Sequence, residues 1–108
     1  MVRLLNQADW GEDRGRIQRL KGWVYYPLLL EAYDTLQEEA LFPSAIHGPA
    51  HIYRVLLLSA LVCQGEGVGE GMVRQVFRAA SYHDVGRTFD GYDVDHGARS
   101  ALRLAELT

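Results

Sequence analysis

The feature that most constrains this chain is an almost wholly apolar run from Pro49 to Cys63. Gly48 and Pro49 give the run a helical start, since proline suits the first helical position, and glycines follow at every second position from 65 to 71. Its uncharged stretch from Val55 to Gln64 is far shorter than the roughly 20 residues that a membrane span needs. A helix that is hydrophobic on every side but too short to cross a membrane belongs at the centre of a bundle. We therefore expect a surrounded central helix that ends at the glycines after Cys63.

Three further segments show helical periodicity, over 27–41, 71–84 and 96–107. Pro27 suits a first helical turn, and Pro43 stops the pattern of the first segment. The side chains expected to face inward are Leu29, Tyr33, Leu36 and Ala40 in the first segment, Val73, Val76, Phe77 and Ala80 in the second, and Ala98, Leu102 and Ala105 in the last.

These segments account for most of the chain, and no strand pattern of useful length occurs beside them. Gly86 is expected to end the 71–84 helix as its C-terminal cap. The sequence therefore predicts an all-α fold, with an irregular N-terminal lead-in over 1–26 and a single helical domain over 27–108.

Length and charge limit the class of protein further. The chain has 108 residues, enough for one domain with one core, and its 14 acidic and 11 basic side chains give a net charge of −3. This balance does not suit a protein that neutralises nucleic-acid phosphates. No export signal or membrane span is visible, so the expected location is the cytoplasm, without membrane or nucleic-acid partners. The single cysteine, Cys63, is expected in the core.

Three familiar motifs are excluded by their spacing. The glycines from 65 to 71 lack the lysine followed by serine or threonine of a phosphate-binding loop, and Glu70 stands where GxGxxG needs its third glycine. The aspartates near Asp93 do not form a calcium loop, because Ala98 and Leu104 stand where such a loop needs glycine and glutamate. No GxSxG motif supports a serine hydrolase.

The four histidines are the strongest candidates for chemistry. His83 and Asp84 continue the inner stripe of the 71–84 helix, and a buried ionisable pair is costly unless a group such as a metal ion satisfies it. His51 lies one turn into the central helix and is expected to share a buried stripe with Leu58 and Val62. His51, His83 and Asp84 are therefore a candidate three-ligand site for a divalent ion.

Simpler interpretations stay open for each histidine. A buried histidine often bonds only to a carbonyl group, His47 fits a loop histidine that bonds the backbone, and His96 fits the cap region of the last helix. Nitrogen and carboxylate ligands suit Mn, Fe, Ni, Co, Zn or Mg, and the sequence does not distinguish between these ions.

Two short strings carry a resemblance to a known family. The order His51-Ile52-Tyr53-Arg54-Val55 followed by His83-Asp84-Val85-Gly86-Arg87 resembles the HD-domain superfamily of helical metal-dependent phosphohydrolases, named for its His-Asp pair. The longer strings over 46–55 and 90–101 are similar to a bacterial branch of HD proteins. The resemblance covers residues 46–104 and implies an HD-domain-like helical bundle.

The resemblance also implies roles for particular residues. His51, His83 and Asp84 match the metal ligands, and Asp84 is also a catalytic candidate that can accept a proton from water. Arg87 matches the lysine or arginine near the bound phosphate and is the second catalytic candidate, since its planar fork suits phosphate oxygens. Further candidates for a second metal ion or for the substrate are His96, His47 and Arg54.

By this resemblance the chain is a metal-dependent phosphohydrolase that cleaves a nucleotide or another small phosphate ester through a metal-activated water. The family pattern ends with an aspartate well beyond the last histidine, whereas here the last helix offers only Glu106. The alternative is therefore a catalytically incomplete HD-fold module that binds a nucleotide or a protein partner without turnover. We expect a small or truncated bundle, and association into a homo-oligomer would cover its apolar central helix.

Overall fold

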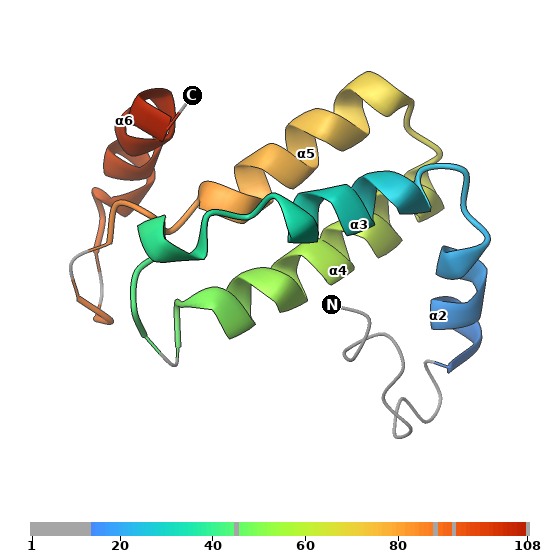
Figure 1. Ribbon diagram of the computed structural model, residues 1–108, viewed down its shortest axis with the longest axis horizontal. Helices are drawn as coiled ribbons and strands as arrows, with labels where there is room; N and C mark the ends of the chain where they lie inside the picture. Colours follow the sequence, from blue (N-terminus) through green and yellow to red (C-terminus); the bar gives the residue numbers. More distant parts are fainter. Residues whose placement is uncertain (1–13, 45, 88, 92, 108) are drawn as a thin grey trace.

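The computed structural model describes residues 14–44, 46–87, 89–91 and 93–107. These residues form five α-helices and one short 3-10 helix, and they include no strand. In Figure 1, α3, α4 and α5 run alongside one another as the body of the molecule, with α2 at one end and α6 at the other. The all-α fold predicted from the sequence is confirmed.

The central helix is α4 (Pro49–Glu66), which packs against α2, α3 and α5. It begins where the sequence predicts, with Gly48 as the N-cap. It continues past the first glycine and ends at Gly67, whose φ of 66° suits glycine and whose N–H donates to the carbonyl of Cys63 at 3.0 Å. Its buried side chains are Ile52, Leu56, Leu57, Ala60 and Cys63, which confirms the core position of the cysteine.

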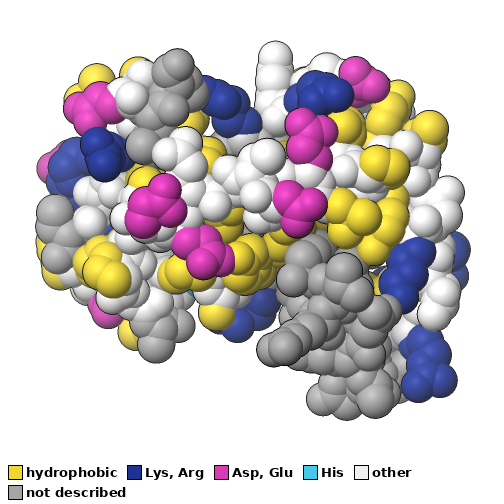
Figure 2. Space-filling view, viewed as in Figure 1, with side chains coloured by type: hydrophobic (Ala, Val, Ile, Leu, Met, Phe, Trp, Pro, Cys, Tyr) yellow, Lys and Arg dark blue, Asp and Glu magenta, His cyan; other side chains and the backbone are white. Residues whose placement is uncertain are grey.

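The expectation that α4 is surrounded on every side is wrong. Leu58 and Val62 are 60% and 63% exposed, although the sequence predicts a buried stripe that joins them to His51. The three helices in contact with α4 cover the face that carries its buried residues and leave the opposite face at the surface. Figure 2 shows that hydrophobic side chains lie at the surface between charged ones on the face of the molecule drawn there.

The N-terminal lead-in is not irregular throughout. Helix α2 (Arg14–Lys21) is regular, and its Ile17 and Leu20 belong to the hydrophobic core. The prediction of an irregular segment over 1–26 is wrong for this helix, because two apolar side chains one turn apart are enough to dock it on α4 although its other side chains are mostly charged. Residues 1–13 lie outside the described residues.

The first helix predicted from the sequence is in fact two elements. Helix α3 covers Tyr26–Asp34, and the 3-10 helix η2 covers Glu38–Ala40. Between them the N–H of Gln37 donates to the hydroxyl of Tyr82 at 3.3 Å, so the chain turns and Leu41 enters the core. Of the expected inward face, Leu29 and Tyr33 are buried, whereas Leu36 and Ala40 are partly exposed.

The remaining helices have the predicted ranges within a few residues, but only α5 (Glu70–Tyr82) has the predicted orientation. Val73, Phe77 and Ala80 of α5 are buried as expected, and Val76 packs beside them. Helix α6 (His96–Leu107) is turned differently, since its expected inner side chains Ala98, Leu102 and Ala105 are exposed. Its buried position is Ser100, because α6 docks through polar atoms rather than through an apolar stripe.

Gly86 does not cap a helix, because α5 ends at Tyr82 with His83 as its C-cap. Gly86 lies instead where α6 approaches the backbone, and a Cβ atom there would be 2.3 Å from the backbone nitrogen of Ser100. Its N–H donates to Ser100 Oγ at 2.8 Å, and its carbonyl accepts a bond from Arg99 Nε at 2.8 Å. The glycine is therefore required by close packing of α6, not by a helix end.

No helix among the described residues is both long enough and apolar enough to cross a membrane.

Candidate metal centre

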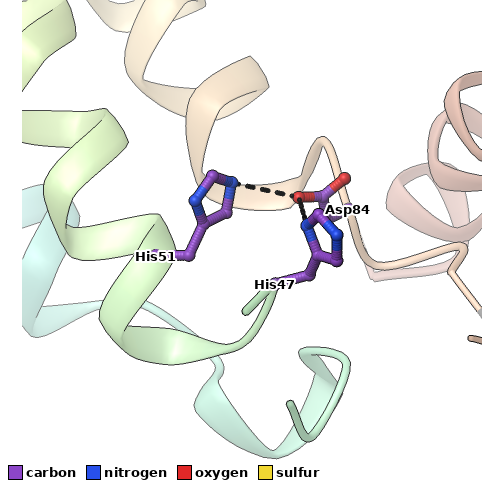
Figure 3. Close-up of side chains that lie close together, drawn as sticks. All are labelled: His47, His51 and Asp84. Carbon is purple, nitrogen blue, oxygen red and sulfur yellow. Dashed lines mark ion pairs between the residues drawn. The ribbon is translucent and has the colours of Figure 1, made fainter. Parts of the chain in front are cut away.

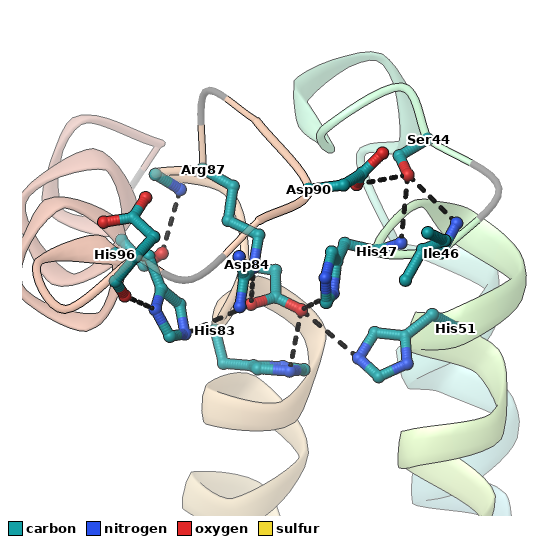
Figure 4. Close-up of polar contacts among 12 residues, drawn as sticks. Ser44, Ile46, His47, His51, His83, Asp84, Arg87, Asp90 and His96 are labelled. Atoms are coloured by element: carbon teal, nitrogen blue, oxygen red, sulfur yellow. Dashed lines mark hydrogen bonds and ion pairs between the residues drawn. The ribbon is translucent and has the colours of Figure 1, made fainter.

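A cluster of polar side chains forms around Asp84, which lies in the turn after α5 and is 3% exposed. Figure 4 shows side chains from several segments directed at its carboxylate. The members of this Asp84 cluster are His47 from the loop before α4, His51 from α4, His83 and Arg87 from the turn after α5, and His96 from the start of α6. All four histidines of the chain therefore meet at one buried carboxylate.

One oxygen of Asp84 faces three imidazoles. Oδ2 lies 3.1 Å from His83 Nε2, 3.2 Å from His51 Nε2 and 3.5 Å from His47 Nδ1. Figure 3 shows His47 and His51 approaching this oxygen from adjacent parts of the chain, and their ring centroids are 5.6 Å apart in an edge-to-face arrangement.

The other oxygen of Asp84 is used differently. Oδ1 accepts a bond from Arg87 Nε at 3.0 Å and lies 3.4 Å from His96 Nε2. Arg87 also donates from Nη1 to the carbonyl of Gly91 at 3.2 Å. Arg87 therefore holds the carboxylate in one orientation and leaves Oδ2 to the three imidazoles.

Backbone carbonyls fix the orientation of two of the rings. His83 Nδ1 lies 2.8 Å from the carbonyl of Ala80, and His96 Nδ1 lies 2.7 Å from the carbonyl of Asp93. A carbonyl can only accept a hydrogen bond, so Nδ1 carries the proton in both rings and Nε2 of a neutral ring presents its lone pair to Asp84. Histidines that bind metal ions typically have this arrangement, with one nitrogen held by a carbonyl and the other free to coordinate.

His47 provides an independent sign of a missing ligand. Its Nδ1 atom is buried and has no hydrogen-bond partner among the described residues. Leaving a buried polar atom unsatisfied costs about 1–3 kcal/mol, so most such atoms in proteins have a partner. The unsatisfied nitrogen lies on the same side of the carboxylate as His51 and His83, where a cation would satisfy it.

Titration behaviour favours a neutral imidazole at His51. Burial lowers the pKa of His51, Asp84 opposes this shift, and the neighbouring His83, His47 and Arg54 add to it. Burial alone raises the pKa of Asp84, but His83 and Arg87 outweigh it and hold the pKa below its usual value. At neutral pH the cluster therefore offers an ionised carboxylate and at least one neutral imidazole, the forms that bind metal ions.

The spacing of the donor atoms fits a divalent first-row ion. Ligand atoms bonded at about 2.1 Å lie about 3.0 Å apart in an octahedral shell and about 3.4 Å apart in a tetrahedral one. The three imidazole nitrogens lie 3.1–3.5 Å from Oδ2. His47, His51 and Asp84 offer ligand atoms that are all within 4.8 Å of one another, whereas His83 lies outside this group although its Nε2 is 3.1 Å from Oδ2.

Two loop contacts support the cluster from outside. Ser44 Oγ accepts bonds from the backbone N–H groups of Ile46 and His47 at 2.9 and 3.3 Å, and it donates to Asp90 Oδ1 at 2.6 Å. On the other side Arg99 pairs with the carboxylate of Asp93, whose backbone carbonyl holds the ring of His96. These bonds join the loop before α4 and the start of α6 to the site.

The structure brings together most of the candidates expected from the sequence. His51, His83 and Asp84 are in contact, and His47, His96 and Arg87 join them. Arg54 lies one turn beyond His51, is exposed and does not contact Asp84. Three supporting residues were missed, namely Ser44, Arg99 and Ser100. Only Ser44 had a sequence signal, since a serine three residues before His47 is typical of a local turn.

The site is open at the surface, because the side chains of His51, His83 and His96 are partly exposed. A separate cleft of about 380 Å³ lies between α3, α5 and α6, and none of the residues that line it belongs to the Asp84 cluster. Comparisons of the chain with protein-family models, with curated proteins and with solved structures found no match.

Proposed function

We propose that the chain is a metal-dependent phosphohydrolase that acts on a nucleotide or another small phosphate ester. The observation that carries this proposal is the convergence of four histidines on one buried carboxylate, with two rings oriented by carbonyls and one nitrogen left unsatisfied. The resemblance of the strings around His51 and His83-Asp84 to the HD-domain superfamily supplies the reaction class.

Residues of the chain have distinct roles in this proposal. His51, His83 and Asp84 hold the ion, and His47 serves as a fourth ligand in place of the aspartate that the family pattern has beyond its last histidine. Asp93 does not take that place, because its carboxylate is bonded to Arg99 and to the backbone N–H of Asp95. A divalent ion supplies, when bound, an activated water and a positive charge for phosphate oxygens.

Arg87 and His96 adjoin the ion-binding atoms on the other side of the carboxylate. Arg87 orients Asp84 through Nε, and its guanidinium provides a fixed positive charge beside the site for a phosphate oxygen. His96 lies near Oδ1 with its Nε2 available to a substrate oxygen or to a second ion. Both side chains thus face the region that a small phosphate ester would enter.

The test is hydrolysis by metal-free protein to which Mn, Fe, Ni, Co, Zn or Mg is added back. We expect metal-dependent release of phosphate from nucleoside monophosphates or from p-nitrophenyl phosphate, and its loss in His83→Ala and Asp84→Asn. Asp34→Asn is the matched control, since Asp34 is exposed at the end of α3 and far from the cluster in the sequence. Equal turnover by the wild type and His83→Ala would rule out the assignment.

A second candidate is an HD-like module that binds a nucleotide or a protein without turnover. It is favoured by the engagement of Arg87 with Asp84 and Gly91, which leaves fewer donors for a phosphate group. Calorimetric titration with a nucleotide, combined with a phosphate-release assay, separates the two proposals, because the module would bind the nucleotide but release no phosphate. Elemental analysis that finds no stoichiometric ion would also favour this second candidate.

A further inference from the structure

Helix α4 carries a ridge of exposed side chains on the face that its neighbours leave uncovered. Arg54, Leu58, Val62 and Glu66 follow one another at four-residue intervals, which places them along one ridge of the helix. All four are exposed, and the two apolar members lie between an arginine and a glutamate.

A groove borders the ridge on each side. One groove, of about 360 Å³, lies between α4 and α5 and is lined by apolar side chains that include Met72 and Val76. The other, of about 610 Å³, lies between α4 and α2 and is lined in part by Leu61. Leu58 and Val62 line both grooves, so the surface presents an apolar ridge between two hollows. Helices pack by fitting such ridges into such grooves.

We propose that this face binds a second copy of the chain, with α4 packed antiparallel against α4 of the partner. In a two-fold dimer, residue i contacts residue j of the partner and residue j contacts residue i. An axis that passes near residue 60 sets Leu58 against Val62 of the partner subunit. The same axis sets Arg54 against Glu66 of the partner subunit, so each dimer gains two ion pairs at the ends of the apolar contact.

Charge complementarity favours a second copy of the chain as the partner and the antiparallel arrangement of the two α4 helices. A parallel dimer would place Arg54 against Arg54 of the partner subunit and Glu66 against Glu66 of the partner subunit, which repel one another. Among the described residues, neither Arg54 nor Glu66 has a hydrogen bond or ion pair within the chain, so both are available. The dimer also removes the exposed Leu58 and Val62 from water, which favours association.

The first test is sedimentation equilibrium of the full chain and of two matched variants. We expect a dimer for the wild type, a monomer for Val62→Glu and a dimer for Val24→Glu, because Val24 is 74% exposed but lies outside α4. Circular dichroism checks that each variant keeps its helices. If the wild type stays monomeric at millimolar concentration, the proposal is overturned. Binding of the same face to lipid vesicles or to a helix of another protein would not rescue it.

The second test exchanges the charges and does not depend on the apolar contact. Arg54→Glu and Glu66→Arg should each weaken the dimer by about tenfold, since each sets like charges against one another. An equimolar mixture of the two variants should regain the wild-type affinity, because every pair in the mixed dimer joins opposite charges. Glu39→Arg, in η2, is the control and should dimerise normally. A mixture no tighter than its components excludes the antiparallel arrangement.

The dimer proposal stands apart from the proposed hydrolase. Dimer formation should persist after removal of metal by a chelator and in Asp84→Asn, because Asp84 is not part of the ridge. Loss of the dimer under these conditions would overturn the interface proposed here, whereas loss of activity alone would concern only the metal centre.

Discussion

The carboxylate of Asp84 faces four imidazoles and the guanidinium of Arg87, and its two oxygens have different partners. Arg87 donates to Oδ1, and the imidazoles of His47, His51 and His83 face Oδ2. A neutral amide at this position would keep the volume and the bond from Arg87 but lose the negative charge. In the proposed metal site, binding of the ion should therefore depend more on this carboxylate than on the packing around it.

The first prediction concerns that charge. Asp84→Asn should lower the affinity for Mn or Zn by about 100-fold or more, since even groups that only support metal ligands contribute 10–100-fold. Isothermal titration calorimetry of metal-free protein measures the effect. Asp34→Asn should bind as the wild type does, and an unchanged affinity in Asp84→Asn would remove Asp84 from the ligand set.

The second prediction concerns pH. The pKa of His51 is lowered in the folded chain, so between that value and the usual 6.5 the unfolded chain binds the proton more readily. The metal-free protein should therefore lose stability as the pH falls through about 6.5, and Asp84, whose pKa is also lowered, adds a further loss below its usual 3.8. Thermal unfolding at about pH 7.5 and about pH 5.5 measures this difference. It should shrink in His51→Gln, and the same difference in both proteins would contradict the prediction.

At the scale of helices, the sequence best predicts which side chains are buried where two helices pack through apolar side chains. Val73, Phe77 and Ala80 of α5 are such a case. The same logic fails for α6, because Ser100 and Arg99 dock it by hydrogen bonds to Gly86 that no periodicity encodes. It also fails for α4, since an apolar composition does not say which face the neighbouring helices cover.

The third prediction follows from the docking of α6. Gly86→Ala should destabilise the protein by about 2 kcal/mol, since its Cβ would lie 2.3 Å from the backbone of Ser100 and force α6 away. Gly97→Ala is the matched control within α6, where a Cβ atom meets nothing within 4 Å, and it should stabilise the helix by about 0.5–1 kcal/mol. Urea unfolding measures both changes. Equal effects of the two substitutions would contradict this role of Gly86.

At the scale of the whole molecule, the Asp84 cluster joins parts of the chain that share few apolar contacts. His47 lies in the loop before α4, His51 lies in the first turn of α4, and His96 is the first residue of α6. The sequence predicts three of the cluster residues from local patterns, because His51, His83 and Asp84 lie on or next to helices. It could not predict that His47 and His96 reach the two oxygens of the same carboxylate, since that depends on how the loops turn.

The fourth prediction is that a metal ion stabilises the fold as a whole. Free metal at about 100 times its dissociation constant adds about 2.7 kcal/mol, which raises the Tm of a domain of this size by roughly 10 °C or more. Differential scanning calorimetry should show this rise for the wild type and for Asp34→Asn but not for Asp84→Asn. A Tm that is unaffected by metal or chelator in the wild type would favour a purely structural cluster.

The dispersal of the four histidines along the chain also has a kinetic consequence. His47 and His96 are separated by nearly half of the sequence, so a random coil holds them together only after a long loop has closed. During refolding, α3, α4 and α5 can pair before α6 docks. All four imidazoles surround Asp84 only after α6 has docked. In the proposed site the ion is held by residues between His47 and Asp84, so uptake of a coloured ion such as Co²⁺ should report the pairing of α4 with the turn after α5, and the contact of His96 with Asp84 should form only when α6 docks.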